Sequence, residues 1–337
     1  KIVIKNIAEL IQTEDSSQKW VAGSNMNFIN TIKDAFLEIE DGIIKNFGSM
    51  DNWAGIEDWN NTKIIDASGG MVFPTYCDSH THLVFAESRE TEFVDRINGL
   101  SYQEIAHKGG GIINSAKKLQ ETSEDVLFDR ALSRLNEVIM TGTGAIEIKS
   151  GYGLTVESEL KILRVIKRLK EASNATIKST FLGAHALPEK YINNREGYMD
   201  IVINKMLPKF IEEDLVDFID IFCEEGYFTV DDTKRLLNAA SKHAIKAKIH
   251  VNQFNALGGV KASVDLGALS VDHLEEMNDE DFTILSGSNC IPTILPTCSF
   301  FLGIKYSPAR KMISKGLPVA LASDYNPGSS PSGNMNF

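Results

Sequence analysis

From Met71 onward the chain alternates short apolar runs with amphipathic stretches. The apolar runs predict eight strands, at residues 72–80, 144–150, 177–185, 216–224, 247–254, 268–276, 290–297 and 318–324. Between them, residues 123–140, 155–172 and 229–243 have apolar positions at helical spacing and begin with a Ser or Thr that can cap a helix. Eight strand–helix units over roughly 250 residues predict an α/β protein with a (β/α)8 TIM-like barrel. A doubly wound open sheet is the alternative.

Residues 1–70 have a different pattern. Short β-type runs there are broken by Asn, Asp and Gly, and helical periodicity is weak. We therefore expect two domains, a small N-terminal β-sheet domain over residues 1–70 and the barrel over residues 71–337. The chain begins at Lys1 rather than Met, which suggests a trimmed start.

The composition narrows the class of protein. A formal charge of −12 disfavours a nucleic-acid or anionic-membrane surface, although a small anionic substrate could still meet one or two cations inside a pocket. The four cysteines lie in apolar segments without a CxxC pair, so we expect reduced, buried thiols and a cytoplasmic protein. The sequence has neither an apolar run of about 18 residues nor a charged-then-apolar leader.

Polar residues gather at the ends of the predicted strands, where barrels of this kind carry their active sites. Five of the seven histidines are among them. The strand-end residues are His80, His82, Glu147, Lys149, His185, Glu224, Glu225, His250, Gln253, His273 and Asp324. An even scatter of histidines over surface helices would rarely produce this pattern. His107 and His243 belong to helix or loop segments and are assigned no chemistry.

His80 and His82 are two residues apart on one strand, so their imidazoles point to the same side. Alone, the pair could equally be structural or solvent-exposed. His250 and Asp324 reach the same end of the barrel, and imidazoles with one carboxylate are a common ligand set for zinc or iron(II). We therefore expect one divalent metal ion on these four residues, with an open position for water.

Such a metal would lower the pKa of its bound water from near 16 toward about 7. Asp324 could accept the water proton, and His273 could orient the water and pass the proton to the leaving nitrogen. A hydrogen-bonded core histidine is the alternative for His273. Lys149 could carry a carbamate that bridges two metals, but it shares a strand face with Glu147. A local ion pair and a single metal are the plainer interpretation.

These residues belong to segments that resemble the imidazolonepropionase family of the amidohydrolase superfamily. The matching segments are FPTYCDSHTHLVFAESRETEF, GGGI, EIKSGYGL, FLGAHALP, HVNQF followed by LGG, SVDHLE, LPTCSFFLG and ASDYNPGSSP. The HxH pair alone indicates only the superfamily, whereas SGYGL, GAHALP and SDYNPGS are specific to the family. The resemblance implies hydrolysis of the cyclic amide of 4-imidazolone-5-propanoate to N-formimidoyl-L-glutamate in histidine degradation, with one zinc or iron ion.

The resemblance also assigns individual residues. It places the metal on His80, His82, His250 and Asp324, and it implies catalytic roles for Asp324, His273, Gln253 and His185. It maps the substrate contacts onto Arg89, Tyr152, His185, Gln253, Asn326, Gly328 and Ser329. Arg89 could form a two-pronged pair with the propanoate carboxylate, or it could pair only with Glu87 or Glu92.

The chemistry of the other assigned side chains limits the roles that each can take. Tyr152 offers a hydroxyl on a Gly-flanked turn, or it caps the barrel. His185 could donate to the carbonyl oxygen as it becomes an oxyanion. Gln253 stands where some family members have Glu, and it cannot take a proton at neutral pH. Any role as a base must then rest on Asp324 and His273.

Family members continue past Asp324 through strands that complete the small sheet. This chain ends 13 residues later (337 − 324), so the partner strands of residues 1–70 are expected to be absent. We expect a small anionic substrate, no nucleic-acid or membrane partner, and a chain that could form a homodimer. Two alternatives stay open: another cyclic amidase or aminohydrolase acting on a nitrogen heterocycle, and an inactive relative that serves as a binding or scaffold protein.

Overall fold

The computed structural model describes residues 1–14, 19–100, 104–105 and 108–337. His107 lies outside these residues. The chain folds as two compact units, Lys1–Thr75 and Tyr76–Phe337. Within the described residues, no helix is long and apolar enough to cross a membrane.

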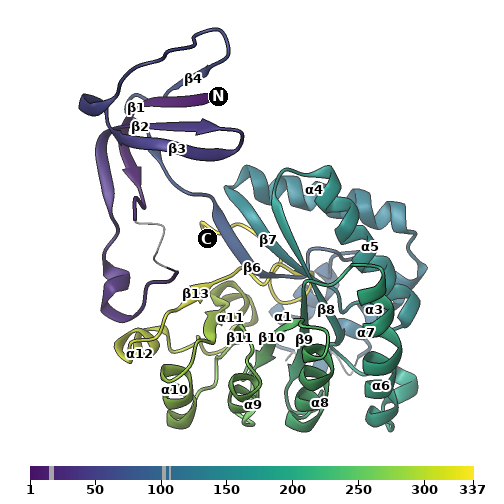
Figure 1. Cartoon of the computed structure of the whole chain (residues 1–337). Coiled ribbons are helices and arrows are strands. Elements are labelled where there is room, and N and C mark those ends of the chain that lie inside the picture. Colours follow the sequence, from purple (N-terminus) through teal and green to yellow (C-terminus); the bar gives the residue numbers. More distant parts are fainter. Residues whose placement is uncertain (15–18, 101–103, 106–107) are drawn as a thin grey trace. The chain divides into compact units, whose positions relative to one another are not determined.

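The N-terminal unit is a small sheet (Figure 1). Its elements are β1 (Ile2–Ile11), η1 (Gly23–Asn27), β2 (Thr31–Glu40), β3 (Ile43–Ser49), η2 (Met50–Asn52), β4 (Lys63–Asp66) and β5 (Met71–Val72). The strand order is β3-β2-β1-β4, and β1 pairs antiparallel with β2 and parallel with β4. Ile7, Leu10, Ala35 and Leu37 form its buried apolar cluster. The predicted N-terminal sheet is confirmed, and β5, just after the expected division at residue 70, also pairs with β1.

The second unit is built on an eight-stranded parallel sheet, as predicted. Its strands are β6 (Tyr76–Thr81), β7 (Thr143–Lys149), β8 (Thr176–Ala184), β9 (Phe218–Cys223), β10 (Lys246–Val251), β11 (Ser270–His273), β12 (Ile291–Ile294) and β13 (Ala320–Leu321). Neighbours in the sequence are neighbours in the sheet, from β6 to β13. An isolated parallel bridge joins Thr81 to Tyr325, so the residues after the last strand return to the first. This arrangement is a (β/α)8 barrel.

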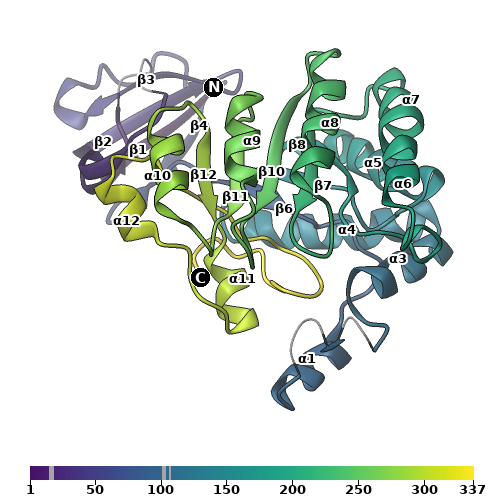
Figure 2. The ribbon, with the colours of Figure 1, turned by 90° about the horizontal axis from the view of Figure 1, so that it is seen from below.

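Most of the helices in this unit cover the outside of the barrel strands, whereas α1 projects away from them (Figure 2). The described helices are α1 (Glu90–Ile97), α3 (Gly111–Glu121), α4 (Glu124–Met140), α5 (Val156–Ala172), η3 (Glu189–Tyr191), α6 (Arg195–Ile201), η4 (Val202–Met206), α7 (Leu207–Glu212), α8 (Val230–Ser241), α9 (Gly259–Asp265), α10 (Asp279–Ser286), α11 (Pro296–Leu302) and α12 (Ala309–Ser314). The three helices expected from periodicity are confirmed as α4, α5 and α8. The hydroxyls of Ser123, Thr155 and Thr229 accept the capping hydrogen bonds at their starts.

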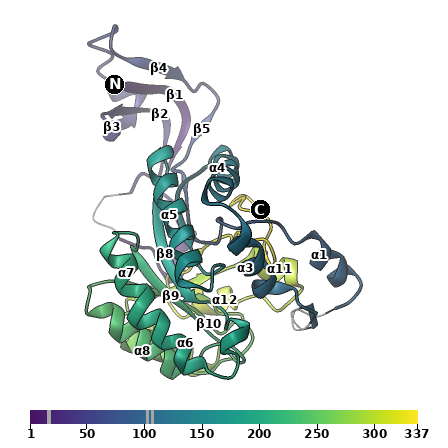
Figure 3. The same cartoon turned by 90° about the vertical axis from the view of Figure 1, so that its right-hand side faces the viewer.

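The main apolar core lies between these helices and the strands. Helices α4 and α5 lie side by side (Figure 3), α5 packs on β8, and α8 and α9 pack on β10. Leu135, Ile162 and Leu169 of the helices join Ile146 and Ile148 of β7 in one buried cluster. The apolar stripes read from the sequence are therefore the faces that hold the barrel and its helices together.

The strands also carry buried polar residues. His80, Lys149, Asp220, His250 and Asp272 are each at most 3% exposed. A buried charge is costly unless it is paired and hydrogen-bonded. These side chains therefore have to satisfy one another, and they do so next to the strand ends that carry the predicted site.

The first strand and the residues after the last strand meet through their backbone at these ends. The N–H of Asp324 donates to the carbonyl of His80 at 3.0 Å, and the N–H of His82 donates to the carbonyl of Tyr325 at 2.8 Å. Asp324 is thereby placed beside the two histidines of β6, although 244 residues separate positions 80 and 324 (324 − 80).

Candidate active site

His80 and His250 face each other inside the barrel. Their Nε2 atoms are 3.0 Å apart. The Nδ1 of His80 lies 2.7 Å from Asp272 Oδ2, and the Nδ1 of His250 lies 2.6 Å from Asp220 Oδ2. Because a carboxylate accepts, Nδ1 carries the hydrogen in each neutral ring. The two Nε2 atoms therefore present lone pairs to each other.

His82 and Asp324 complete this cluster. Asp324 Oδ1 lies 3.6 Å from Nε2 of both His80 and His82. Asp324 also has a left-handed φ of 53°, a backbone conformation that costs about 1–3 kcal/mol and concentrates at functional sites. The ligand atoms of His80, His82 and Asp324 lie within 4.8 Å of one another, as do those of His80, His250 and His273. Imidazoles with a carboxylate could hold a zinc or iron ion here.

Buried ion pairs lie behind the two facing histidines. Lys149 Nζ is 2.9 Å from Glu147 Oε1, which confirms the predicted local pair, and it is also 2.9 Å from Asp220 Oδ2. Burial alone would lower the pKa of Lys149, but Asp220, Glu147 and Asp272 outweigh it and raise that pKa above its ordinary range. Lys248 Nζ lies 3.4 Å from Asp272 Oδ2. The carboxylates that hold the histidines are thus themselves held by ammonium groups.

The charges in this connected set do not cancel. The contacts join the carboxylates of Glu147, Asp220, Asp272 and Asp324 and the ammonium groups of Lys149 and Lys248. When all six groups are ionised, four negative charges face two positive ones. One divalent cation would balance the difference.

A cavity beside the cluster gathers the predicted substrate residues. It is lined by His82, Arg89, Ile112, Tyr152, His185, Phe222, His250, Gln253, His273, Asp324, Asn326 and Ser329. His80 lies against this wall through His250 and Asp324. A Cβ on Gly328 would overlap the guanidinium of Arg89, so this glycine allows the close approach. The structure therefore brings all the sequence-predicted site residues together.

Arg89 offers the cavity a buried cation. Its Nε donates to Ser115 Oγ at 2.8 Å, and its Nη1 is 3.7 Å from Glu92 Oε2. Its Nη2 is buried without a hydrogen-bond partner among the described residues. Glu87, the other expected partner, pairs with Lys118 instead. A guanidinium held in this way keeps donor capacity for an anionic group.

Glu159 builds the turn that carries Tyr152. Its carboxylate accepts hydrogen bonds from the N–H groups of Gly151, Gly153 and Leu154, at 2.9, 2.7 and 2.8 Å. A Cβ on Gly153 would overlap the backbone of Glu159. The SGYGL segment is therefore a tight loop around one buried carboxylate, and it sets the position of Tyr152.

His185 is held in one tautomer. Its Nδ1 lies 3.1 Å from the carbonyl oxygen of Gly151, which can only accept, so Nδ1 carries the hydrogen. Burial lowers the pKa of His185 to about 4. In the neutral ring Nε2 is then an acceptor. Donation to an oxyanion, as expected from the sequence, would need the imidazolium form, which this environment disfavours.

His273 and Asp324 both line the cavity. Glu275 Oε1 lies 3.5 Å from Nδ1 of His273. Burial alone would lower the pKa of His273, but Glu275 and Asp324 outweigh it and raise that pKa. Burial raises the pKa of Asp324 to about 6. Gln253 lies nearby, with its Nε2 3.6 Å from Cys298 Sγ.

Asn326 orders the last loop of the site. Its Oδ1 accepts from the N–H groups of Gly328 and Ser329, each at 2.8 Å. Its Nδ2 donates to the carbonyl of Asp324 at 2.6 Å and to Ser329 Oγ at 2.7 Å. These bonds fix the backbone around Asp324 and turn the hydroxyl of Ser329 toward it.

Sequence reasoning missed the groups behind the site, namely Asp220, Asp272, Lys248 and Glu159. A charged residue inside an otherwise apolar strand, as Asp220 in FIDIF, was the available signal. Such a residue is stable in the interior only when it has an ion-pair or hydrogen-bond partner there. The partners come from other strands, which the sequence alone does not align.

The eight-stranded barrel with imidazoles and a carboxylate at its strand ends is the architecture of metal-dependent hydrolases, and the relatives given below place the chain among the hydrolases of the amidohydrolase superfamily. Solved structures share the fold. E. coli guanine deaminase matches with a TM-score of 0.73 and 12% identity, over 99% of this chain and 76% of that chain. A triazine hydrolase variant matches with a TM-score of 0.71 and 14% identity, over 99% and 73%. Atrazine chlorohydrolase TrzN from Arthrobacter aurescens complexed with zinc matches with a TM-score of 0.69 and 13% identity, over 99% and 74%.

The chain belongs to the imidazolonepropionase family. It is 56% identical over 336 residues to the imidazolonepropionase of Christiangramia forsetii, and this match covers 100% of this chain and 81% of the relative. It is 43% identical over 328 residues to the imidazolonepropionase of Clostridium tetani, and this match covers 97% of this chain and 78% of the relative. No family model matches the chain. The resemblance noted in the sequence is therefore confirmed, and the chain is an enzyme, a hydrolase.

Proposed function

We propose that the chain hydrolyses the cyclic amide of 4-imidazolone-5-propanoate to N-formimidoyl-L-glutamate, a step of histidine degradation. The relatives named imidazolonepropionase support this reaction. One observation carries it: Arg89, whose Nη2 has no hydrogen-bond partner among the described residues, lines the same cavity as the histidines and Asp324. A substrate with a carboxylate tail and a scissile amide needs both features in one place.

The metal ligands in this proposal are His80, His82, His250 and Asp324. The facing Nε2 lone pairs and the excess of carboxylates over ammonium groups fit one divalent cation, zinc or iron(II). When bound, such an ion activates a water and polarises the amide carbonyl. The zinc of the atrazine chlorohydrolase structure is consistent with a metal in this fold.

Asp324 and His273 move the proton in this scheme. A carboxylate oxygen of Asp324 takes a proton from the attacking water, and His273 gives a proton to the ring nitrogen that leaves. The water oxygen bonds to the carbonyl carbon, and the carbon–nitrogen bond of the ring breaks.

The cavity wall orients the substrate. Arg89 pairs with the propanoate carboxylate. His185, an acceptor at Nε2, takes a hydrogen bond from a ring N–H, and the amide of Gln253 holds a ring nitrogen without acting as a base. The ring of Tyr152, 5.5 Å from the guanidinium carbon of Arg89, lies beside the carboxylate position. Asn326 and Ser329 of the last loop line the same cavity.

Replacement of Asp324 tests the reaction. Asp324→Ala should abolish ring opening of the imidazolone, followed by its ultraviolet absorbance, while the circular dichroism spectrum stays that of the folded barrel. Asp129→Ala, on the exposed face of α4, is the matched control and should keep full activity. Turnover retained by Asp324→Ala would contradict the mechanism.

A second candidate is another cyclic amidase or an aminohydrolase acting on a nitrogen heterocycle. Its support is the shared fold with guanine deaminase and triazine hydrolase. Such an enzyme would not need Arg89 for a carboxylate tail. An Arg89→Ala variant whose KM for the imidazolone is unchanged would favour it. An inactive scaffold relative is less consistent with the site, because all four proposed ligands are present and close together.

We further propose a cytoplasmic location and a small anionic substrate. The thiols of Cys77, Cys223, Cys290 and Cys298 are all free, which is consistent with a reducing compartment. Three of them are buried as expected, whereas the expectation was wrong for Cys77, which is exposed at the start of the barrel. Assembly into a homodimer stays a prediction.

A further inference from the structure

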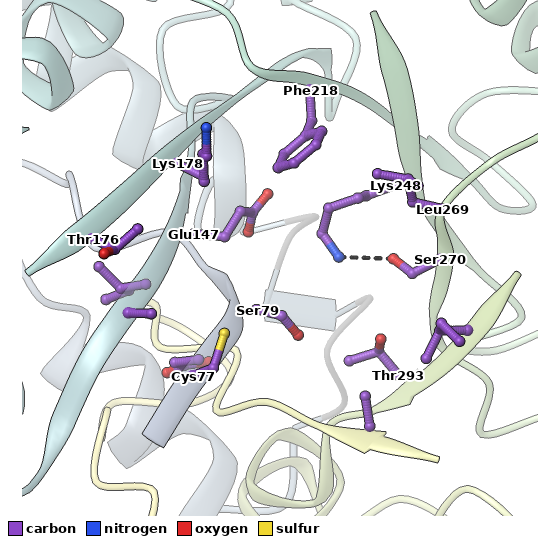
Figure 4. A pocket seen from close by; sticks show the side chains of 15 residues that line it. Cys77, Ser79, Glu147, Thr176, Lys178, Phe218, Lys248, Leu269, Ser270 and Thr293 are labelled. Carbon is purple, nitrogen blue, oxygen red and sulfur yellow. Dashed lines mark hydrogen bonds between the residues drawn. The ribbon is translucent and has the colours of Figure 1, made fainter. Parts of the chain in front are cut away.

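A second cavity lies at the opposite, N-terminal end of the barrel strands, with a volume of about 390 Å³. Figure 4 shows Lys248 extending into it toward Ser270, with the side chain of Glu147 nearby. Lys248 is two residues before His250 on β10, and Glu147 is two residues before Lys149 on β7, so each pair shares a strand face. The ion pairs behind the metal site therefore reach the floor of the barrel.

One chain of contacts runs from Lys248 to His80. Lys248 Nζ donates to Ser270 Oγ at 2.7 Å and lies 3.4 Å from Asp272 Oδ2. Ser270 Oγ in turn donates to Asp272 Oδ1 at 2.6 Å. Asp272 Oδ2 accepts from Nδ1 of His80 at 2.7 Å. Ser270 and Lys248 thus hold both oxygens of this aspartate, and Oδ2 also accepts the hydrogen bond from His80.

A parallel chain runs from Lys149 to His250. Lys149 Nζ lies 2.9 Å from Asp220 Oδ2, which accepts from Nδ1 of His250 at 2.6 Å. Asp220 Oδ1 accepts from the backbone N–H groups of Ile221 and His250, at 2.7 and 3.0 Å. Lys149 is itself anchored by Glu147 at 2.9 Å. Two lysine–aspartate–histidine chains, each built from three different strands, thus converge on the two facing Nε2 atoms.

We propose that Lys149 and Lys248 are positioning residues of the metal centre. Each holds an aspartate that fixes the ring orientation and tautomer of a ligand histidine, so that Nε2 of His250 and of His80 points at the metal. Groups behind the ligands of a metal commonly set its affinity. The inference rests on the proposed metal site, and it assigns a role to charges that lie outside the substrate cavity.

The sign of the effect separates this role from a purely electrostatic one. An ammonium group acting only through its charge repels a divalent cation, so its removal would tighten metal binding. An ammonium group that positions a ligand strengthens metal binding. Its removal lets the aspartate and the ligand histidine change orientation, so it would weaken metal binding. The metal affinity of lysine variants therefore decides between the two.

The experiment measures Zn²⁺ affinity of the metal-free chain by competition with a chromophoric chelator. Lys248→Met and Asp272→Asn should each weaken binding about ten- to a hundredfold. Because Lys248 acts through Asp272, the double variant should bind no more weakly than Asp272→Asn alone. Methionine keeps the aliphatic stem, and the floor cavity leaves room for it. Lys149→Met with Asp220→Asn repeats the test on the second chain.

Lys178→Met is the matched control. Lys178 lines the same floor cavity and pairs with Asp217, and its side chain is 52% exposed. It should leave Zn²⁺ affinity within about twofold of the original chain, since it holds no ligand histidine. The unfolding midpoint of each metal-free variant shows whether a loss of affinity comes from general destabilisation.

Two results would overturn the inference. One is unchanged or tighter Zn²⁺ binding by Lys248→Met; the other is a double variant whose losses add in full. If Lys149→Met fails to fold, the Lys248 chain decides alone. A chain that binds no Zn²⁺ or Fe²⁺ before any substitution would instead contradict the proposed metal site itself.

Discussion

The Nε2 atoms of His80 and His250 lie 3.0 Å apart while a carboxylate holds the Nδ1 of each ring. Two lone pairs at this distance repel each other, and the fixed strands of the barrel prevent the rings from separating. A cation that binds both nitrogens converts this repulsion into attraction. The folded chain is therefore prepared for a metal before one arrives.

Removal of the metal should make the barrel easier to unfold. At a free Zn²⁺ concentration of about 100 times Kd, binding to the folded state alone adds about 2.7 kcal/mol to its stability. The thermal unfolding midpoint should fall on treatment with a chelator and recover when Zn²⁺ is added. His250→Ala should lose this response, and His243→Ala, at an exposed position, should keep it. A midpoint indifferent to the chelator would contradict the proposed site.

Gly328→Ala should impair substrate binding more than folding. The new methyl group would overlap the guanidinium of Arg89, whose flexible end can move aside. Displacement of one charge-assisted contact costs about 1.5–3 kcal/mol, so KM should rise about ten- to a hundredfold. Gly287→Ala, where the nearest atom would be 3.8 Å away, serves as the control. Steady-state kinetics of the two variants check this, and an unchanged KM in Gly328→Ala would count against Arg89 as the carboxylate site.

Glu159→Ala should destabilise the barrel strongly. It leaves the buried N–H groups of Gly151, Gly153 and Leu154 without their acceptor, and each such group costs about 1–3 kcal/mol. A loss of at least about 3 kcal/mol is expected in urea unfolding. Glu157→Ala, an exposed neighbour in the first turn of α5, should change stability by less than about 0.5 kcal/mol. Equal effects of the two variants would show that Glu159 does not support the turn.

Asp217 should make stability fall in acid. Burial alone would raise the pKa of Asp217, but hydrogen bonds from Lys170, the N–H of Ser179 and Lys178 outweigh it and hold that pKa well below its ordinary value. The unfolded chain then binds the proton more readily than the folded one. The stabilisation is complete above about pH 4, the unfolded pKa, and is lost as the pH falls toward the folded pKa.

The Asp217→Asn variant measures this contribution. Its urea midpoint should lie below that of the original chain at neutral pH, and the difference should shrink as the pH falls below about 4. Asp231→Asn, at an exposed position of α8, should show no such trend. A difference that stays constant over this range would mean that Asp217 does not titrate with folding.

The barrel itself could be predicted from the sequence, because strand and helix periodicities and helix caps are local signals. Helices α4, α5 and α8 begin where Ser123, Thr155 and Thr229 predicted, and the eight strands follow the expected order. The histidines of the site could be found for a related reason. In a parallel barrel all strand ends meet at one rim, so a position in the sequence already implies a position in space.

The contacts behind the site could not be predicted in this way. Asp220 meets a histidine 30 residues away, and Asp272 meets one 192 residues away. Those pairings depend on the register between strands and on which side chains turn inward. The local periodicity of the sequence does not determine either of them. The Glu147–Lys149 pair was predictable since both residues lie on one strand; the bond from Lys149 to Asp220 was not.

The backbone bond between Asp324 and His80 has a consequence for how the molecule comes apart. Contacts between residues so far apart along the chain form late, after the intervening units have folded. An ion held by His80, His82 and Asp324 would bind the first strand of the barrel to the segment after the last. Interactions that form late slow the opening of a protein more than they speed its folding. The ion that takes part in catalysis would then also slow unfolding, and its loss would shorten the lifetime of the folded enzyme.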